Sequence, residues 1–331
     1  MAMAQMAADG AAPSVYTTRL PAVKRLSRHK RRKIMNPYDV IREDRKKLVD
    51  KIIEMMRQGT FGNAEIWNSK AMRPQNPLTN VRYRGGNRMR LMAAVVANGY
   101  TDPRWATHRQ IAAAGYHINP GEHGIICEKW IYDKEVKKQD SAGNIYYEKE
   151  TLQRPRVSYF RVFNAQQASG FPEYDASYEK TEIMAVADRI IRSSRCPVRE
   201  LAQEKAYYSP AKDEIILPLR SRFKDDVSFL KTLVHECCHS TAAPDRLNRQ
   251  LGGVFGSPEY AKEELRAEIG ALFTETDLHV PLQGEHYEDH SDYLRSWISI
   301  LQDDYNEFFR ACSDAEQISQ YLLENYSTVS I

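Results

Sequence analysis

Apolar and polar positions alternate with two different periods in the first half of the chain. Residues 39–58 carry apolar side chains three and four positions apart, which predicts an amphipathic helix that Gly59 ends. A shorter helix is expected over 91–98. Strands with apolar and aromatic residues are predicted further on, at 125–132, 145–147 and 157–163. These elements indicate a mixed α+β region.

Helical spacing dominates the second half. A helix over 182–195 precedes a hairpin over 206–218. Residues 227–238 then offer a broad apolar surface at helical spacing, behind the cap-type residues Asp225 and Asp226. A further helix with one apolar stripe is expected over 260–273.

The length of 331 residues suggests about two domains. The sequence predicts an α+β fold of two domains, and we divide the chain as follows: a disordered basic arm, 1–35; a first domain, 36–165; a linker, 166–176; and a second domain, 177–331.

Composition is typical of a soluble globular protein, with 42% hydrophobic and 27% charged residues. No apolar run approaches the ~20 residues that span a bilayer, so no membrane partner is expected. The N-terminus lacks a hydrophobic signal core. The five cysteines are odd in number and without C-x-x-C spacing, which favours a reducing compartment. We therefore expect a cytoplasmic protein.

Charge divides sharply between the halves. Residues 1–165 hold 30 lysines and arginines against 15 aspartates and glutamates, a net of +15, whereas residues 166–331 hold 17 against 29, a net of −12. A basic half is suited to a polyanion, and we predict that it binds nucleic acid largely independently of base sequence.

Within this half, basic and aromatic residues gather beside the glycine pair Gly85-Gly86, which we interpret as flexible. Arginines hold phosphates while an aromatic ring stacks on an unpaired base, which favours single-stranded DNA. The predicted contacts are Arg82, Tyr83, Arg84, Asn87, Arg88, Trp105, Thr107, Arg109 and Gln110. A charge-rich surface loop without a ligand is the alternative interpretation.

The strongest chemical motif is H-E-x-x-H, formed by His235, Glu236 and His239. On a helix, positions i and i+4 lie on one face, so both imidazoles can bind one metal ion. Glu236 would then act as the general base toward water at the open coordination position. The alternative is a chance occurrence of the motif on a core helix.

The helix predicted over 260–273 carries glutamates at 263, 264 and 268. Their arrangement resembles the helix from which gluzincin-type zincins take a third ligand. This resemblance assigns Glu264 as that ligand and Glu268 as the acceptor that holds a ligand histidine in its tautomer. Glu263 is expected to face solvent. The implied metal is Zn²⁺, although Mn²⁺ or another divalent ion suits the same donors.

Longer runs resemble one known family. Y-R-G-G-N (83–87), G-Y-T-D-P-R-W-A-T-H-R-Q (99–110) and G-E-H-G (121–124) look like the N-terminal domain of ArdC-type antirestriction proteins. A-Y-Y-S-P-A-K-D-E-I-I-L-P (206–218) and H-E-C-C-H-S-T (235–241) look like that family's zincin domain. The resemblance implies a single-stranded DNA-binding domain joined to a metallopeptidase, carried by mobile elements, that protects incoming DNA from restriction.

Three functions fit these features. The first is a DNA-binding zinc metallopeptidase that acts on a protein or peptide substrate of unknown identity. The second is a DNA-coating antirestriction protein whose metal site is structural or vestigial. The third is a regulatory peptidase that cleaves a repressor. The presence of Glu236 favours a catalytic metal site over a structural one, because a structural zinc site needs no general base. We therefore predict the first.

Overall fold

The computed structural model describes residues 36–61, 70–175, 182–251, 256–281 and 291–329. The arm predicted for residues 1–35 and part of the predicted linker lie outside these ranges. Helix α1 (Pro37–Arg57) begins where the side chain of Asn36 accepts a hydrogen bond from the amide of Tyr38. Its buried side chains pack into the core, as the helical spacing of apolar residues predicted.

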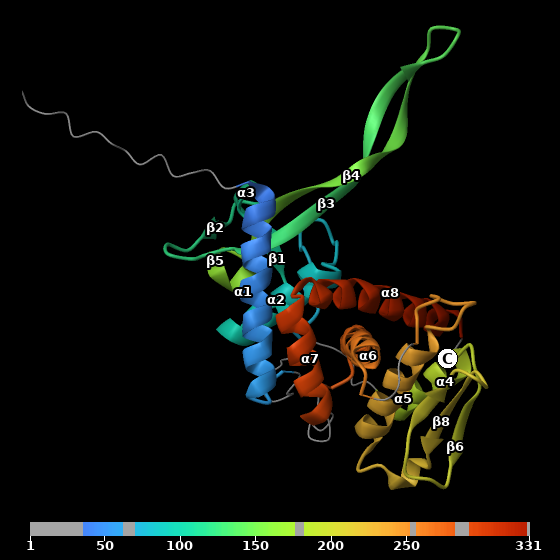
Figure 1. Cartoon of the computed structure of the whole chain (residues 1–331). Helices are drawn as coiled ribbons and strands as arrows, with labels where there is room; N and C mark the ends of the chain where they lie inside the picture. The colour runs from blue at the N-terminus through green and yellow to red at the C-terminus, as the bar shows by residue number, and fades with distance from the viewer. Residues whose placement is uncertain (1–35, 62–69, 176–181, 252–255, 282–290, 330–331) are drawn as a thin grey trace, which may run out of the picture. The chain divides into compact units, whose positions relative to one another are not determined.

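A long antiparallel hairpin dominates the first domain. Strands β3 (Ile125–Gln139) and β4 (Ile145–Asn164) pair along most of their length, and β1 (Trp105–Thr107) adds to β4 to give the order β1-β4-β3. Figure 1 shows the hairpin extending away from the helices. The two strands predicted over 145–147 and 157–163 are parts of one strand, opposite a bulge between Ile131 and Asp133.

Short elements join this hairpin to its neighbours. They are α3 (His108–Ala113), β2 (His117–Ile118), the 3₁₀ turn η1 (Ala165–Gln167) and β5 (Ala168–Ser169), which pairs with β2. Residues 166–169 of the predicted linker therefore pack with the first domain.

In the second domain, helices pack beside a small sheet. The strands β6 (Val198–Leu201), β7 (Tyr207–Ser209) and β8 (Glu214–Pro218) form a sheet in the order β6-β8-β7. The helices are α4 (Ile183–Ser193), α5 (Asp226–Ser240) and α6 (Pro258–Asp277), with the turn η2 (Arg220–Arg222) leading into α5. Helix α5 contacts α4, β7 and β8, and α6 packs on α5. The prediction of a two-domain α+β fold is confirmed.

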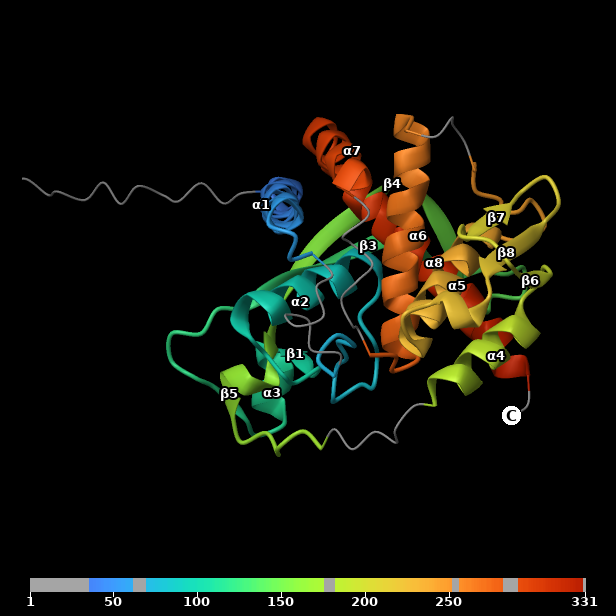
Figure 2. The same ribbon diagram turned by 90° about the horizontal axis from the view of Figure 1, so that it is seen from below.

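Two C-terminal helices complete the structure, and the sequence interpretation did not include them. They are α7 (Ser291–Asp303) and α8 (Asn306–Thr328). Helix α8 contacts α2 (Gly85–Asn98) as well as α4, α5 and α6, and Figure 2 shows it passing behind α6. One hydrophobic cluster therefore contains Met89 and Trp105 of the first domain together with Phe273 and Phe308 of the second.

The cysteines are free thiols and all five are buried. Cys237 and Cys238 lie in the hydrophobic cluster around α5, as expected for residues that fill a core. Among the described residues, no helix is both long and apolar enough to span a membrane.

Candidate metal centre

Helix α5 brings two imidazoles to one point. Asp225 caps the helix by accepting a hydrogen bond from the amide of Ser228 at 2.7 Å. One helical turn separates His235 from His239, so both side chains leave the same face. Their Nε2 atoms lie 3.1 Å apart, and both side chains are largely buried.

Helix α6 supplies a carboxylate to the same point. It begins at the cap residue Ser257 and lies against α5. The Oε2 atom of Glu264 is 3.5 Å from Nε2 of His235, and its Oε1 atom is 3.5 Å from Nε2 of His239. Metal–ligand bonds of ~2.0–2.1 Å at tetrahedral angles separate neighbouring donors by roughly 3.3 Å. The three side chains therefore have the spacing of donors to one metal ion.

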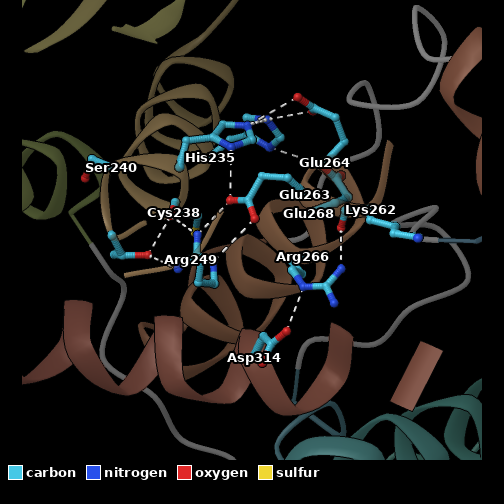
Figure 3. A network of polar contacts seen from close by, with 12 residues as sticks. His235, Cys238, Ser240, Arg249, Lys262, Glu263, Glu264, Arg266, Glu268 and Asp314 are labelled. Carbon is cyan, nitrogen blue, oxygen red and sulfur yellow. Dashed lines mark hydrogen bonds and ion pairs between the residues drawn. The ribbon is translucent and has the colours of Figure 1, made fainter. Parts of the chain in front are cut away.

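Two more glutamates of α6 stand behind the histidines. The Oε2 atom of Glu268 lies 3.1 Å from Nδ1 of His235, and Oε1 of Glu263 lies 3.6 Å from Nδ1 of His239. The expectation that Glu263 faces solvent is wrong, because its side chain is 7% exposed and is held by Arg249 at 2.7 Å. Figure 3 shows Glu263 beside Arg249, with the contacts between them drawn as dashed lines.

Arg249 ties this glutamate to helix α5. Its guanidinium also donates to Oγ1 of Thr241 at 2.7 Å and to the carbonyl of Cys238 at 3.0 Å. The sequence interpretation missed Arg249 and Glu263. A signal was present in the consecutive glutamates at 263 and 264, since two ligand histidines each need an acceptor for the other ring nitrogen.

The carboxylates make the cluster attractive to positive charge. Burial alone would lower the pKa of His235, but hydrogen bonds to Glu264 and Glu268 outweigh it and raise this pKa well above its ordinary value. His239 is affected likewise, with burial outweighed by Glu263 and Glu264, so that its pKa rises to about 9. Burial would raise the pKa of Glu264, yet the two imidazoles lower it strongly. A divalent cation would satisfy the same carboxylates.

Glu236 follows His235 on α5 and is 7% exposed. Its negative charge contributes to the raised pKa of His235, so it lies within electrostatic reach of the cluster. Adjacent residues on a helix point about 100° apart. The side chain of Glu236 therefore points in a different direction from that of His235, and Glu236 is not one of the three clustered donors.

Most residues predicted to contact DNA make contacts within the fold. The ring of Trp105 is fully buried, and Arg88 is buried and donates to Asp277, to Thr276 and to the carbonyl of Phe273. Four further residues make hydrogen bonds within the first domain: Tyr83 to the carbonyl of Trp105, Asn87 to the backbone of Glu128, and Thr107 with Gln110 in a capping box. Burial raises the pKa of the Tyr83 hydroxyl.

Three of the nine predicted residues remain exposed, namely Arg82, Arg84 and Arg109. The interpretation of Gly85-Gly86 as flexible is wrong, because these residues start helix α2. A Cβ atom on Gly86 would lie 2.7 Å from Cδ1 of Phe309 on α8. The glycine therefore permits close packing of two helices.

Comparisons with known proteins agree with this arrangement. The family described as the N-terminal domain of anti-restriction factor ArdC matches residues 42–163, and the family described as zincin-like metallopeptidase matches residues 185–314. The crystal structure of the antirestriction protein ArdC from plasmid R388, in its metal-free form, has a TM-score of 0.68 and 27% identity, covering 87% of this chain and 99% of that one. Its Mn(II)-bound form gives the same TM-score at 26% identity, covering 86% of this chain and 99% of that chain.

Curated relatives give the same picture. DNA primase TraC of Escherichia coli is 37% identical over 288 residues, which cover 83% of this chain but 19% of that protein; a second TraC is 35% identical, with 26% of its length covered. The chain thus spans only about a fifth to a quarter of the length of these two relatives. The protein y4eC of Sinorhizobium fredii (strain NBRC 101917 / NGR234) is 30% identical over 284 residues, covering 83% of this chain and 90% of that protein. The chain therefore belongs to the ArdC-type antirestriction family, in which an ArdC N-terminal domain precedes a zincin-like metallopeptidase domain.

Proposed function

We propose that this protein is a single-stranded DNA-binding zinc metallopeptidase that protects the incoming DNA of a mobile element from restriction in the cytoplasm. The observation that carries the enzymatic part is the convergence of His235, His239 and Glu264 from two helices. The antirestriction part is supported by membership of the ArdC-type family.

Residues of the cluster take distinct roles in this proposal. His235, His239 and Glu264 would hold the metal ion. Glu268 would accept a hydrogen bond from Nδ1 of His235, and Glu263 would orient His239 from 3.6 Å. When bound, the ion acts as a Lewis acid on water and on the substrate carbonyl. Glu236 accepts a proton from the attacking water and delivers it to the leaving amine.

Zinc is the preferred ion because two imidazoles and one carboxylate with an open fourth position are the donors of catalytic zinc sites. Manganese is the second candidate, since the related ArdC from plasmid R388 has a Mn(II)-bound structure. Both ions accept the same nitrogen and oxygen donors.

DNA binding is assigned to the first domain. Support comes from its excess of basic residues, from its match to the ArdC N-terminal domain, and from relatives that are named DNA primases. Fewer arginines are exposed than the sequence suggests, because Arg88 and Arg90 form buried ion pairs. Binding through the remaining exposed arginines would be independent of base sequence and weakened by salt.

Two alternatives make different predictions. A DNA-coating protein with a structural or vestigial metal site would bind DNA and metal but cleave nothing, and a repressor-cleaving peptidase would cleave without DNA. The presence of Glu236 next to His235 on α5 favours a catalytic site, because a purely structural site needs no general base.

The decisive experiment measures metal content and proteolysis, including self-cleavage, for the wild-type chain and Glu236→Gln, with and without single-stranded DNA. We expect one metal ion per chain in both proteins, equal DNA binding, and cleavage by the wild type only. Equal cleavage by Glu236→Gln would remove that residue from its role, and no cleavage by either protein would favour the DNA-coating alternative.

A further inference from the structure

Three arginines of the first domain converge on one carboxylate at the end of helix α6. Arg73 lies 2.9 Å and Arg82 lies 3.6 Å from Oδ1 of Asp277, while Arg88 lies 3.1 Å from Oδ2. Asp277 is the last residue of α6, whereas the arginines belong to the first domain. Together with Arg84 they line a pocket of about 340 Å³.

The pocket carries an excess of positive charge. Four arginines line it, against the carboxylates Asp277, Glu316 and Glu324. Burial, followed by the nearby charge of Arg73, lowers the pKa of Arg82, as expected where guanidinium groups crowd together. An added anion would relieve this crowding.

Two buried donors in the pocket lining lack a hydrogen-bond partner among the described residues. They are Nε of Arg88 and Oγ of Ser319, in side chains that are almost completely buried. Both residues line the pocket. An unsatisfied buried donor costs about 1–3 kcal/mol, so an acceptor oxygen that reached either atom from the pocket would be stabilised.

A larger groove adjoins the pocket. Its volume is about 1190 Å³, and it shares the lining residues Arg84, Glu316 and Gln320 with the pocket, so the two hollows lie side by side. The groove is also lined by Trp130 and Tyr132 of β3, which are 36% and 57% exposed.

Two contacts hold the Trp130 ring in place. Its Nε1 atom donates to Oε2 of Glu128 at 2.8 Å, and the guanidinium of Arg45 lies 5.6 Å from the ring centroid. A fixed aromatic ring is suited to base stacking, which is worth about 1–3 kcal/mol per base. Arginines that hold phosphate beside rings that stack on bases are the recurring pattern of single-strand binding sites.

We propose that the pocket of Arg73, Arg82 and Arg88 binds one backbone phosphate of a single DNA strand, and that the strand continues along the adjoining groove toward Trp130 and Tyr132. This inference rests on the proposed DNA binding and assigns it a location. It also makes helix α8 of the second domain part of the DNA site, through Glu316 and Ser319. A peptide carboxylate is a weaker candidate for the pocket, because its binding would leave the two exposed rings of the adjoining groove unexplained.

The experiment measures binding of a fluorescent oligothymidylate to the full chain over a range of salt concentrations. Arg82→Gln/Arg84→Gln removes two exposed arginines of the pocket, and Arg57→Gln/Arg199→Gln removes two exposed arginines that line neither hollow. We expect the first variant to lose affinity about tenfold. The slope of log affinity against log salt concentration should become shallower by about 0.7, the value for one phosphate of a single strand. The control should change less than about twofold, since exposed ion pairs are weak.

A second variant tests the groove with a different signature. Tyr132→Ala should lower affinity about tenfold through lost stacking while leaving the salt slope unchanged. If the wild type binds DNA and the pocket variant binds it as tightly as the control variant does, the location of the DNA site is wrong and the proposed function stands. If acetate displaces the oligonucleotide as well as inorganic phosphate does, the pocket is a carboxylate site. A wild type that binds no DNA would contradict the proposed function itself.

Discussion

The Oε2 atom of Glu268 lies 3.1 Å from Nδ1 of His235, which joins helix α6 to helix α5 behind the three donor atoms. A carboxylate at this position accepts a hydrogen bond from the Nδ1–H group. The lone pair of Nε2 is then directed at the donor cluster. Glu263 stands in the corresponding place behind His239. One helix thus supplies both the candidate ligand Glu264 and the groups that orient the two histidines.

Glu268→Gln should weaken metal binding about 10- to 100-fold while retaining the three donor side chains, because the amide no longer holds the tautomer of His235 as firmly. Competition with a zinc chelator measures the affinity. Glu259→Gln, in the exposed first turn of the same helix, is the matched control and should bind metal as the wild type does. An unchanged affinity for Glu268→Gln would contradict its assigned role.

Arg249→Met should lower the free energy of unfolding of the metal-free protein by about 3 kcal/mol, because it leaves Glu263 buried without its strongest partner. Urea unfolding measures the change. In the double variant Arg249→Met/Glu263→Gln the buried charge is gone, so part of the stability should return. A loss of less than about 1 kcal/mol for the single variant would show that the pair contributes little.

Gly86→Ala should destabilise the fold by about 1–3 kcal/mol, because the added methyl group would overlap the ring of Phe309 where α2 meets α8. Thermal or urea unfolding measures the effect. Asn98→Ala, at the exposed end of the same helix, tests for a general effect of helix substitution and should change stability much less. If both variants are equally stable, α2 and α8 do not pack as closely as described.

The free energy of unfolding should decrease at low pH, because Glu128 becomes protonated and loses its ion pairs. Burial tends to raise the pKa of this carboxyl, but ion pairs with Arg45 and Arg90 outweigh it and lower the pKa from 4.5 to about 2. A lowered folded-state pKa contributes stability above pH 4.5 that is lost as pH falls toward 2, and the shift corresponds to about 3 kcal/mol.

Glu128→Gln isolates this contribution. The variant should be less stable than the wild type at pH 7, and the difference should shrink between pH 4.5 and pH 2, as followed by urea unfolding at several pH values. A difference that stays constant over this range would mean that Glu128 does not titrate with a lowered pKa.

The local pattern of apolar residues was sufficient to predict most helices. The spacing that predicted the helix over 39–58 is seen in α1, and the surface predicted around His235 is seen in α5. The helix α8 was within reach of the same reasoning, because Phe308, Cys312, Ala315 and Ile318 follow a helical period and are buried. Strand lengths were harder, since a bulge and an exposed hairpin interrupt the alternation of β3 and β4.

The surface of the first domain could not be predicted from composition. Arg88 was predicted to contact DNA, and Arg90 adds to the basic charge of the same segment, yet each arginine is buried and meets a carboxylate, Asp277 for Arg88 and Glu128 for Arg90. Asp277 is 189 residues from Arg88 along the chain, a separation that no local pattern reports. The same long-range packing forms the pocket around Asp277.

The sequence alone determined the chemistry available to this protein, because helical periodicity places His235 and His239 on one face whatever surrounds them. It also determined the charge contrast between the halves and the family. Only the tertiary structure decided which glutamates meet the histidines and which arginines remain exposed. Both depend on how α6 and α8 cross other helices, and crossing is set by side chains far apart in the chain.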